Sequence, residues 1–341
     1  MIGLSSIQVD DVERELLLHP LVGGVVLFTR NFESITQLEL LVAEIRQLRT
    51  PHLLIAVDHE GGRVQRFRKD FTVLPAVGQL GNIYKTNVDR ARQLSQLSGW
   101  LMAAELRAVG IDFSFAPVLD IDKHVSQIIG DRGFATDPES VTDLARHYIR
   151  GMREAGMAAT GKHFPGHGSV RADTHLSMAI DERRFEDIEY DDLIPFERMI
   201  NNGIEAMMIA HVLYRNIDSN PAGFSSFWLQ KILRKQMGFE GVIFSDDLEM
   251  VGAHSVGSPA DRAKLALSAG CDVVLVCQTR DAIEDVIDNL TLQTNPASQL
   301  RMARMHGRSA PNRVQLQADP KWKHAVKQVL AYDEPHTLDL I

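Results

Sequence analysis

The sequence predicts an α/β fold in which eight parallel strands close into a single (β/α)8 TIM-type barrel. Short apolar runs alternate along the chain with longer amphipathic stretches, and a strict alternation of strands and helices is typical of a parallel sheet. Eight such runs favour a closed barrel, whereas an open doubly wound sheet is the rival arrangement. The chain has 341 residues, a length that α/β barrels commonly reach as one domain.

The expected strands are near-continuous apolar runs, the pattern of strands that are buried on both faces of a parallel sheet. They cover residues 2–5, 23–28, 53–57, 113–118, 158–162, 206–210, 242–245 and 273–277. The expected helices cover residues 34–49, 89–109, 138–155, 192–202, 226–237, 259–269 and 280–290. In the first of these helices, apolar residues recur at helical spacing from Leu38 to Leu48, and Ser34 is suited to cap its N-terminus.

A glycine recurs at the same place in the repeated unit. Five expected helices end in a glycine shortly before the next strand, namely Gly110, Gly156, Gly203, Gly238 and Gly270. A helix that reverses into a strand commonly ends in a left-handed residue, which glycine adopts without a Cβ clash. The recurrence indicates one repeated helix–glycine–strand unit, so we expect residues 1–305 to form one barrel domain. Residues 306–341 are expected to form a C-terminal tail that packs on the barrel or is partly disordered.

Composition and charge narrow the classes of partner. The chain carries 36 Lys and Arg against 45 Asp and Glu, a formal net charge of −9, without a block of basic residues. This balance argues against nucleic acid and anionic membranes as partners. Cys271 and Cys277 are too few for a disulfide scaffold and lack the spacing of a metal knuckle. Acidic residues near the N-terminus, and the lack of an apolar run of ~18 residues, argue against a signal peptide and a membrane span. We therefore expect a soluble, cytoplasmic protein.

Charged residues and histidines follow five of the expected strands in succession. They are Asp58-His59-Glu60, Asp120, Lys162-His163, His211 and Asp246-Asp247. If the sheet closes into a barrel, the carboxyl ends of its strands meet at one mouth, where the active sites of barrel enzymes lie. Burying so many charges without a ligand or a function is costly, so the set predicts a polar site at the mouth.

Residues 162–168, Lys-His-Phe-Pro-Gly-His-Gly, form a segment rich in glycine and imidazole at the end of the fifth expected strand. Asp173 and His175 follow it two positions apart, so both side chains point the same way in an extended loop. Asp173 can then accept a hydrogen bond from one imidazole nitrogen and leave the other free to exchange protons. We expect His167 to shape this loop and His59 to pack beneath the site.

Two adjacent carboxylates, Asp246 and Asp247, end the seventh expected strand. Side chains alternate between the two faces of a strand, so only one of the pair can face the mouth if both stay on the strand. One carboxylate would then be the reactive group and the other a supporting one.

These residues admit three functions. A carboxylate nucleophile with a separate proton donor suits glycosyl transfer, because a negative charge stabilises an oxocarbenium-like transition state. The second function is a metal-dependent hydrolase, with candidate ligands His163, His167, His175, His211, Asp173 and Asp246. The third is a binding protein without chemistry. The first expected strand lacks the His-x-His pair of many barrel metallohydrolases, and Lys162 would repel a cation. A glycine-rich imidazole loop also suits a rigid binding pocket poorly.

Three segments resemble glycoside hydrolase family three. They are residues 58–66 (Asp-His-Glu-Gly-Gly-Arg-Val-Gln-Arg), residues 162–168 with Asp173-Thr-His175, and residues 244–250 (Phe-Ser-Asp-Asp-Leu-Glu-Met). Segments 24–31, 115–120 and 130–134 match as well, so the resemblance covers residues 1–305 in order. It implies a single-domain β-N-acetylglucosaminidase of bacterial cell-wall recycling. Such enzymes act in the cytoplasm on N-acetylglucosaminyl-1,6-anhydromuramoyl (peptide) fragments.

The same resemblance implies a role for each matching residue. Asp246 would be the nucleophile that forms a covalent glycosyl-enzyme, His175 the acid/base, and Asp173 its partner. The residues that would hold the N-acetylglucosamine hydroxyls and acetamido group are Asp58, Arg66, Arg132, Lys162 and His163, and Asp247 would be structural. No cofactor or metal is implied, and the expected partner is a small sugar or muropeptide bound by a monomer.

An imidazole acid/base fits a sequence in which no Glu stands at a suitable position. The pKa of imidazole starts near ~6.5 rather than at the ~4.3 of a Glu carboxyl, so it exchanges protons near neutral pH with less tuning by its surroundings. Asp173 would stabilise the imidazolium that forms. The glycosyl-enzyme can pass its sugar to water or to phosphate, and the sequence leaves hydrolysis and phosphorolysis both open.

Overall fold

The computed structural model describes residues 1–170, 178–254, 256–291 and 295–332 of the chain. Two four-stranded parallel sheets form its centre, in the strand orders β1-β2-β3-β6 and β12-β11-β9-β7. The strands are β1 (Ile2–Gly3), β2 (Gly24–Leu27), β3 (Leu54–Val57), β6 (Phe113–Ser114), β7 (Thr160–Phe164), β9 (Ala206–Ile209), β11 (Val242–Asp247) and β12 (Val273–Leu275). Each overlaps one of the eight runs expected from the sequence.

Two bridges join the edges of these sheets and close the barrel. Val118, just after β6, pairs in parallel with Lys162 of β7, and Ile2 of β1 pairs in parallel with Val276, just after β12. Backbone hydrogen bonds support both junctions, with Leu119 N 2.7 Å from Lys162 O and Val276 N 3.1 Å from Met1 O. The ring of eight strands is therefore complete, and the predicted (β/α)8 barrel is confirmed.

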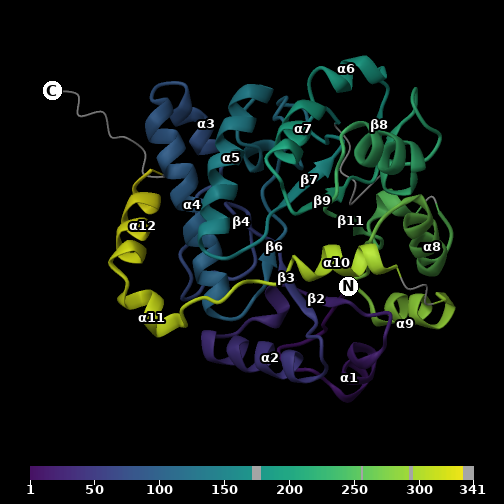
Figure 1. The fold of residues 1–341 in the computed structure, drawn as a ribbon, viewed down its shortest axis with the longest axis horizontal. Coiled ribbons are helices and arrows are strands. Elements are labelled where there is room, and N and C mark those ends of the chain that lie inside the picture. The colour runs from purple at the N-terminus through teal and green to yellow at the C-terminus, as the bar shows by residue number, and fades with distance from the viewer. Residues whose placement is uncertain (171–177, 255, 292–294, 333–341) are drawn as a thin grey trace.

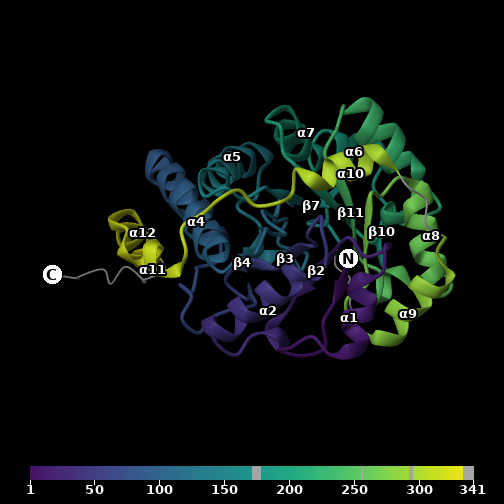
Figure 2. The same cartoon turned by 60° about the horizontal axis from the view of Figure 1, so that its bottom comes forward.

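Helices surround this ring on the outside (Figure 1, Figure 2). They are α1 (Asp11–Leu18), α2 (Ile35–Gln47), α3 (Gly78–Tyr84), α4 (Val88–Ala108), α5 (Pro138–Glu154), α6 (Phe185–Glu189), α7 (Leu193–Asn201), α8 (Pro259–Ala269), α9 (Arg280–Asn289), α10 (Pro296–Ala303), α11 (Arg313–Ala318) and α12 (Pro320–Ala331). The segment η4 (Phe227–Gln236) is π-helical, and short 3-10 turns are η1 (Thr29–Asn31), η2 (Gly130–Arg132), η3 (Ala222–Phe224) and η5 (Val251–Ala253). Outside the ring, β4 (His59–Gly61) pairs antiparallel with β5 (Val64–Gln65), and β8 (Ala179–Asp181) pairs in parallel with β10 (Val212–Tyr214).

Local signals in the sequence set the ends of these helices. The Ser34 hydroxyl accepts a hydrogen bond from the Gln37 backbone N at 3.2 Å, so the predicted cap of α2 is confirmed. The five glycines named above all have positive φ, between +69° and +128°, so their predicted left-handed conformation is confirmed too. Of the seven helices expected from the sequence, the one at residues 226–237 differs, because the structure forms the π-helix η4 there and not an α-helix.

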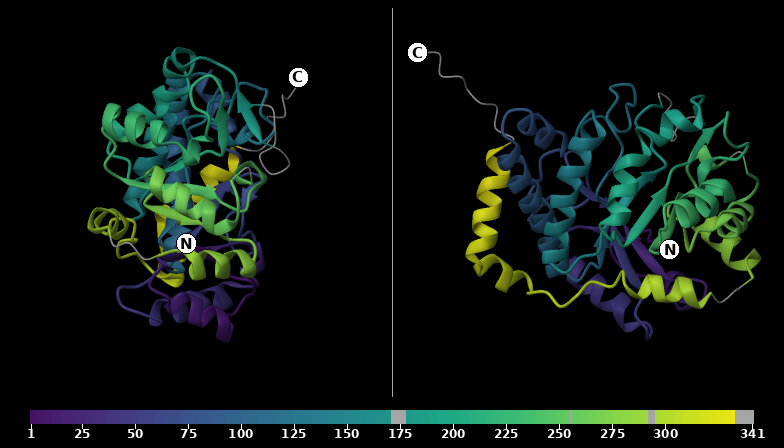
Figure 3. Two further views of the ribbon diagram at one scale, coloured as in Figure 1. Left: turned by 90° about the vertical axis from the view of Figure 1, so that its right-hand side faces the viewer. Right: turned by 45° about the horizontal axis from the view of Figure 1, so that its top comes forward.

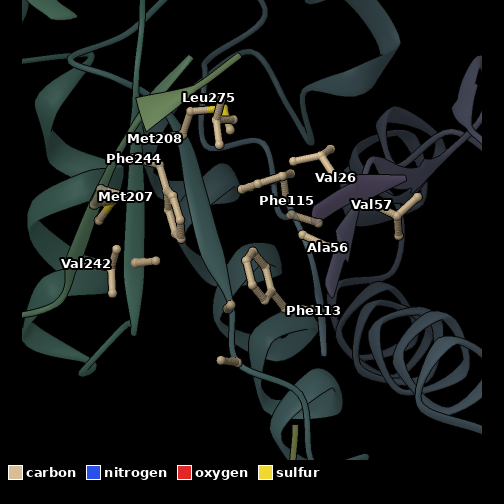
Figure 4. Packing of buried hydrophobic residues seen from close by; sticks show 14 of the residues in the cluster. Val26, Ala56, Val57, Phe113, Phe115, Met207, Met208, Val242, Phe244 and Leu275 are labelled. Atoms are coloured by element: carbon tan, nitrogen blue, oxygen red, sulfur yellow. The ribbon is translucent and has the colours of Figure 1, made fainter. Parts of the chain in front are cut away.

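Apolar side chains fill the inside of the barrel (Figure 4). The rings of Phe113, Phe115 and Phe244 pack with centroids 5.2 to 5.7 Å apart, and burial of each ring contributes about 1.5–3 kcal/mol. Phe115, Met208 and Leu275 belong to this core and also line a cavity above it. The core of the barrel is thus the floor of that cavity.

The described part of the C-terminal segment lies against the barrel. Residues 304–308 cross the amino ends of the strands, where Gly307 N donates to Asp112 Oδ1 at 3.1 Å and Arg308 N donates to Gly156 O at 2.9 Å. Helices α11 and α12 then pack beside α4 (Figure 3), and Trp322 Nε1 donates to Glu105 Oε1 at 2.9 Å. The division of the chain into a barrel domain and a tail at residue 305 stays a prediction.

Candidate active site

A cavity of about 560 Å³ opens at the carboxyl ends of the barrel strands. Its lining comes from the strands β2, β5, β7, β9, β11 and β12 and from residues that follow β2, β3, β4, β5, β6, β7, β11 and β12. This volume lies within the range of small-ligand sites, and barrel enzymes have their active sites at this end. A second cavity, of about 400 Å³, lies at the opposite end, between the amino ends of β7, β9 and β11 and residues 301–308. The predicted site residues that the structure describes line the first cavity and not the second.

The centre of the site is the buried ammonium group of Lys162 from β7, a side chain that is 2% exposed. Its Nζ lies 3.0 Å from Asp58 Oδ1 and 2.5 Å from Glu60 Oε1. Burial alone would lower the pKa of Lys162, but the two carboxylates outweigh that effect and raise the pKa. The side chain is therefore cationic at neutral pH, and its charge is balanced from two sides.

Two arginines complete the network around these carboxylates. Arg132 binds Glu60 through two parallel hydrogen bonds, from Nε and Nη2, each 2.8 Å long. Arg66 Nη2 donates to Asp58 Oδ2 at 3.3 Å. Burial would raise the pKa of Glu60 and of Asp58, but the neighbouring cations hold both below their usual values. Fixed charges of this kind can bind a polar ligand without reorganising.

A tight hairpin brings Arg66 back to Asp58, eight positions earlier in the chain. The hairpin joins β4 to β5 through Gly61 and Gly62, whose φ angles of +105° and +55° lie in the region that favours glycine. A Cβ on Gly61 would come within 2.6 Å of Pro75 O. The Gly-Gly pair therefore permits the turn on which the arginine–carboxylate contact depends.

Asp120 holds the histidines that follow Lys162. Its carboxylate is buried, with Oδ2 2.6 Å from His163 Nδ1 and Oδ1 accepting from the His167 backbone N at 2.7 Å. Burial would raise the pKa of Asp120, but His163 and these hydrogen bonds outweigh it and lower the pKa. A carboxylate can only accept, so Nδ1 of His163 carries the proton and Nε2 is left for a ligand. The sequence placed Asp120 at a strand end, and the fold makes it the residue that orients His163.

Asp246 and Asp247 both lie on the cavity wall, so the expectation that only one could face the mouth is wrong. The register of β11 against β12 shifts between Phe244 and Asp247, where two residues of β11, Ser245 and Asp246, stand opposite the single residue Val274 of β12. A bulge of this kind re-aims side chains and breaks simple alternation. Oδ1 of Asp246 accepts a hydrogen bond from the Asp247 backbone N at 2.8 Å.

The Asp247 carboxylate is tied to the surrounding loops. Gln278 Nε2 donates to its Oδ2 at 2.9 Å, and the Glu249 backbone N donates to its Oδ1 at 3.1 Å. Burial raises the pKa of Asp247 to about 6. Because both of its oxygens are engaged, these contacts agree with a structural role for Asp247.

Six of the eight predicted site residues line this one cavity. They are Asp58, Arg66, Arg132, Lys162, His163 and Asp246. The other two, Asp173 and His175, lie outside the described residues, and the individual roles of all eight stay predictions. The sequence placed Glu60 among the charged residues at the mouth but gave it no role in the site, although its spacing from Asp58 was a signal for one. Residues two positions apart lie on the same side of an extended segment.

Two further histidines lie near the site but not in it. The buried ring of His59 packs beneath the site, as expected, with its centroid 6.0 Å from Phe67 and 5.7 Å from Phe71, and burial lowers its pKa to about 3. The expectation that His211 faces the mouth is wrong. Its ring is buried, stacks on Phe224 at 5.4 Å and does not line the cavity. The position of a residue at a strand end fixes where it lies along the barrel axis. It does not fix whether the side chain points into the barrel or outward.

Two kinds of feature are absent from the described residues. Among them, no group of three or more His, Cys, Asp or Glu side chains is placed to hold a metal ion. No helix within the described ranges is both long and apolar enough to cross a bilayer. Both cysteines are buried and unpaired.

A family of known enzymes matches nearly the whole barrel. The family model of the glycosyl hydrolase family 3 N-terminal domain matches residues 2–305. The chain belongs to glycoside hydrolase family 3. The β-hexosaminidase of Thioalkalivibrio sulfidiphilus is 54% identical over 340 residues, which cover 100% of this chain and 98% of that protein. The β-hexosaminidase of Hydrogenovibrio crunogenus is 50% identical over 329 residues, which cover 96% of this chain and 92% of that protein.

Solved structures of this family share the fold along the whole chain. NagZ from Neisseria gonorrhoeae in complex with N-trifluoroacetyl-D-glucosamine has a TM-score of 0.93 at 42% identity, covering 98% of this chain and 97% of that chain. The β-N-acetylhexosaminidase of Beutenbergia cavernae has a TM-score of 0.77 at 28% identity, covering 97% of this chain and 94% of that chain. The family 3 chain described here is accordingly a glycoside hydrolase of the β-N-acetylhexosaminidase type.

Glu60→Gln is expected to destabilise the protein strongly. It removes a buried charge that balances Lys162 and Arg132, and breaking one partner of a buried ion pair costs about 3–5 kcal/mol. Activity on an aryl N-acetyl-β-glucosaminide should fall as well, mainly through a higher KM, because the network then presents its polar groups less rigidly. Urea unfolding and steady-state kinetics measure the two effects.

Glu139→Gln is the matched control for this substitution. Glu139 also makes two hydrogen bonds to one arginine, Arg198, but its side chain is exposed, and surface pairs are worth about 0–1 kcal/mol. Equal losses of stability in the two variants would show that burial of the network is not what matters.

Proposed function

We propose that the chain is a retaining β-N-acetylglucosaminidase of bacterial cell-wall recycling. It would release terminal N-acetylglucosamine from N-acetylglucosaminyl-1,6-anhydromuramoyl (peptide) fragments, through a covalent glycosyl-enzyme on Asp246 with a His175/Asp173 acid/base dyad. The observation that carries the proposal is the place of the Asp246 carboxylate, on the wall of the cavity that holds the Lys162 network. The names of similar proteins support it, since they are β-hexosaminidases and a NagZ bound to a glucosamine derivative.

Asp246 has the surroundings that a carboxylate nucleophile needs. One oxygen is held by the Asp247 backbone N, which orients the group. Among the described residues, no Lys or Arg forms an ion pair with Asp246, so none of these cations neutralises its charge. The anomeric carbon becomes positive in the transition state, and a fixed carboxylate beside it stabilises that charge.

The reaction would take two displacements. First, an oxygen of Asp246 attacks the anomeric carbon while the bond to the leaving-group oxygen breaks, and protonated His175 transfers its proton to that oxygen. Second, water attacks the same carbon, His175 takes up a proton from the water, and the bond to Asp246 breaks. Two inversions restore the β configuration. Asp173 would stabilise the imidazolium that alternates between the steps.

The charged network supplies the groups that would hold the sugar. Lys162, Arg66 and Arg132 can donate hydrogen bonds to the hydroxyl and acetamido oxygens, Asp58 can accept them, and His163 turns Nε2 away from Asp120. The apolar floor suits the C–H faces of a sugar ring. No cofactor takes part in either displacement.

The same proposal makes the enzyme a cytoplasmic monomer with small sugar or muropeptide substrates. Cys271 and Cys277 are both buried and unpaired, which suits a reducing compartment. The net charge of −9 disfavours nucleic acid and anionic membranes as partners.

Incubation with an aryl N-acetyl-β-glucosaminide, in water and then in phosphate buffer, tests the proposed function. We expect free N-acetylglucosamine in both media, first released as the β anomer, and a loss of more than ~10³-fold in Asp246→Ala. Asp288→Ala, which removes an exposed carboxylate from α9, should keep full activity. N-acetylglucosamine 1-phosphate as the main product would make the enzyme a phosphorylase, and turnover that does not depend on Asp246 would overturn the mechanism.

His175→Ala separates proton donation from binding. The variant should slow substrates with poor leaving groups by about 10²–10⁴-fold and activated aryl substrates far less, because an activated leaving group needs little protonation. A series of aryl leaving groups measured by kcat/KM gives the comparison, and His324→Ala, exposed on α12, is the histidine control. The same loss across the whole series would remove His175 from the acid/base role.

A further inference from the structure

His167 is a buried histidine on the cavity wall whose ring nitrogens have no hydrogen-bond partner among the described residues. Its side chain is 4% exposed and lines the cavity together with His163 and Asp246. Neither Nδ1 nor Nε2 forms a hydrogen bond within the part of the chain that the structure describes. Leaving a buried polar group without a hydrogen bond is costly, so two such nitrogens on one ring require an explanation.

The shape of the loop does not require this imidazole. The contact that fixes the loop to Asp120 comes from the His167 backbone N, which any residue other than proline would supply. The neighbouring glycines set the path, because a Cβ on Gly168 would come within 1.8 Å of Ile121 O and one on Gly166 within 2.7 Å of Asp192 Cβ. The ring nitrogens are therefore free to serve another purpose.

The ring has the chemistry of a neutral hydrogen-bonding group. Burial lowers the pKa of His167 against the opposing charge of Asp120, so at neutral pH the ring carries one N–H donor and one acceptor nitrogen. Lys162 and the arginines of the cavity only donate, and Asp58 only accepts. A sugar hydroxyl both donates and accepts hydrogen bonds. A neutral imidazole can therefore bind it either as the donor, through N–H, or as the acceptor, through the unprotonated nitrogen.

We propose that His167 is a substrate-contacting residue whose imidazole forms a hydrogen bond with the 3-, 4- or 6-hydroxyl of the bound N-acetylglucosamine unit. The inference deepens the proposed function and rests on it. The ring centroids of His167 and His163 are 6.1 Å apart, so the two imidazoles can engage neighbouring groups of one sugar. A bound hydroxyl satisfies a nitrogen that no described residue of the protein pairs with, and this gain exists only in the complex.

A cycle of enzyme and substrate variants tests the contact. His167→Phe keeps a flat ring of similar size and removes both nitrogens. Its kcat/KM is compared with that of the wild type on the parent aryl N-acetyl-β-glucosaminide and on analogues that lack the 3-, 4- or 6-hydroxyl. On the parent substrate we expect kcat/KM of the variant to be about tenfold lower than that of the wild type, as for the loss of one neutral hydrogen bond. On one of the deoxy analogues, which lacks the hydroxyl that His167 contacts, the two enzymes should have the same kcat/KM. His167→Gln, which restores a donor and an acceptor, should recover part of the loss.

His211→Phe is the matched control. His211 is also buried with both ring nitrogens unpaired among the described residues, but it does not line the cavity. Its substitution should change kcat/KM by one common factor on the parent and on every deoxy analogue. Thermal unfolding shows that each variant is folded, and His167→Leu replaces His167→Phe in the cycle if the latter is not.

The outcomes separate this inference from the proposed function. If the wild type hydrolyses the parent substrate while the His167 variant loses nothing, or loses the same factor on the parent and on all deoxy analogues, His167 touches no hydroxyl and the proposal is overturned. If the wild type hydrolyses no N-acetyl-β-glucosaminide at all, the proposed function fails first.

Discussion

The buried ammonium group of Lys162 is the constraint on which the rest of the site depends. A lone charge in the interior costs several kcal/mol, so Lys162 needs Asp58 and Glu60, and these carboxylates in turn need arginines from η2 and from the end of the β4–β5 hairpin. The backbone of Lys162 also pairs with Val118 across the gap between the two sheets. Lys162 thus takes part in one of the two junctions that close the barrel and also carries the charge at its mouth. Asp246 stands outside these ion pairs, so the charges that would hold a sugar do not neutralise the group that would attack it.

Features that a few neighbouring residues encode could be predicted from the sequence alone. A strand that is buried on both faces must be apolar throughout, and the eight apolar runs therefore located the strands of the barrel. The cap at Ser34 and the left-handed glycines at the helix ends are equally local, and the structure confirms them. The candidate site followed from the same logic, because the parallel topology gathers all carboxyl ends of the strands at one mouth.

Features that depend on contacts between distant segments could not be predicted from the sequence. The pairing of Glu60 with Arg132 joins residues 72 positions apart, and the bulge in β11 arises from its register with β12, so neither shows in a single run of residues. The face from which His211 leaves its strand is likewise set by tertiary packing on Phe224. Helix α11 lies in a polar segment that was expected to be a tail, although a capping box at its start was a local signal for it.

The central claim is that this cavity cleaves a glycosidic bond with retention, through a covalent intermediate on Asp246. Trapping that intermediate is the most direct test. In a 5-fluoro N-acetylglucosaminyl substrate, the fluorine slows both displacements. An activated leaving group keeps the first displacement faster than the second, so the glycosyl-enzyme accumulates. The account predicts a mass increase of one glycosyl unit per chain, located by peptide mass spectrometry at Asp246 and absent from Asp246→Ala. A label on another residue, or consumption of the substrate without any covalent adduct, would contradict it.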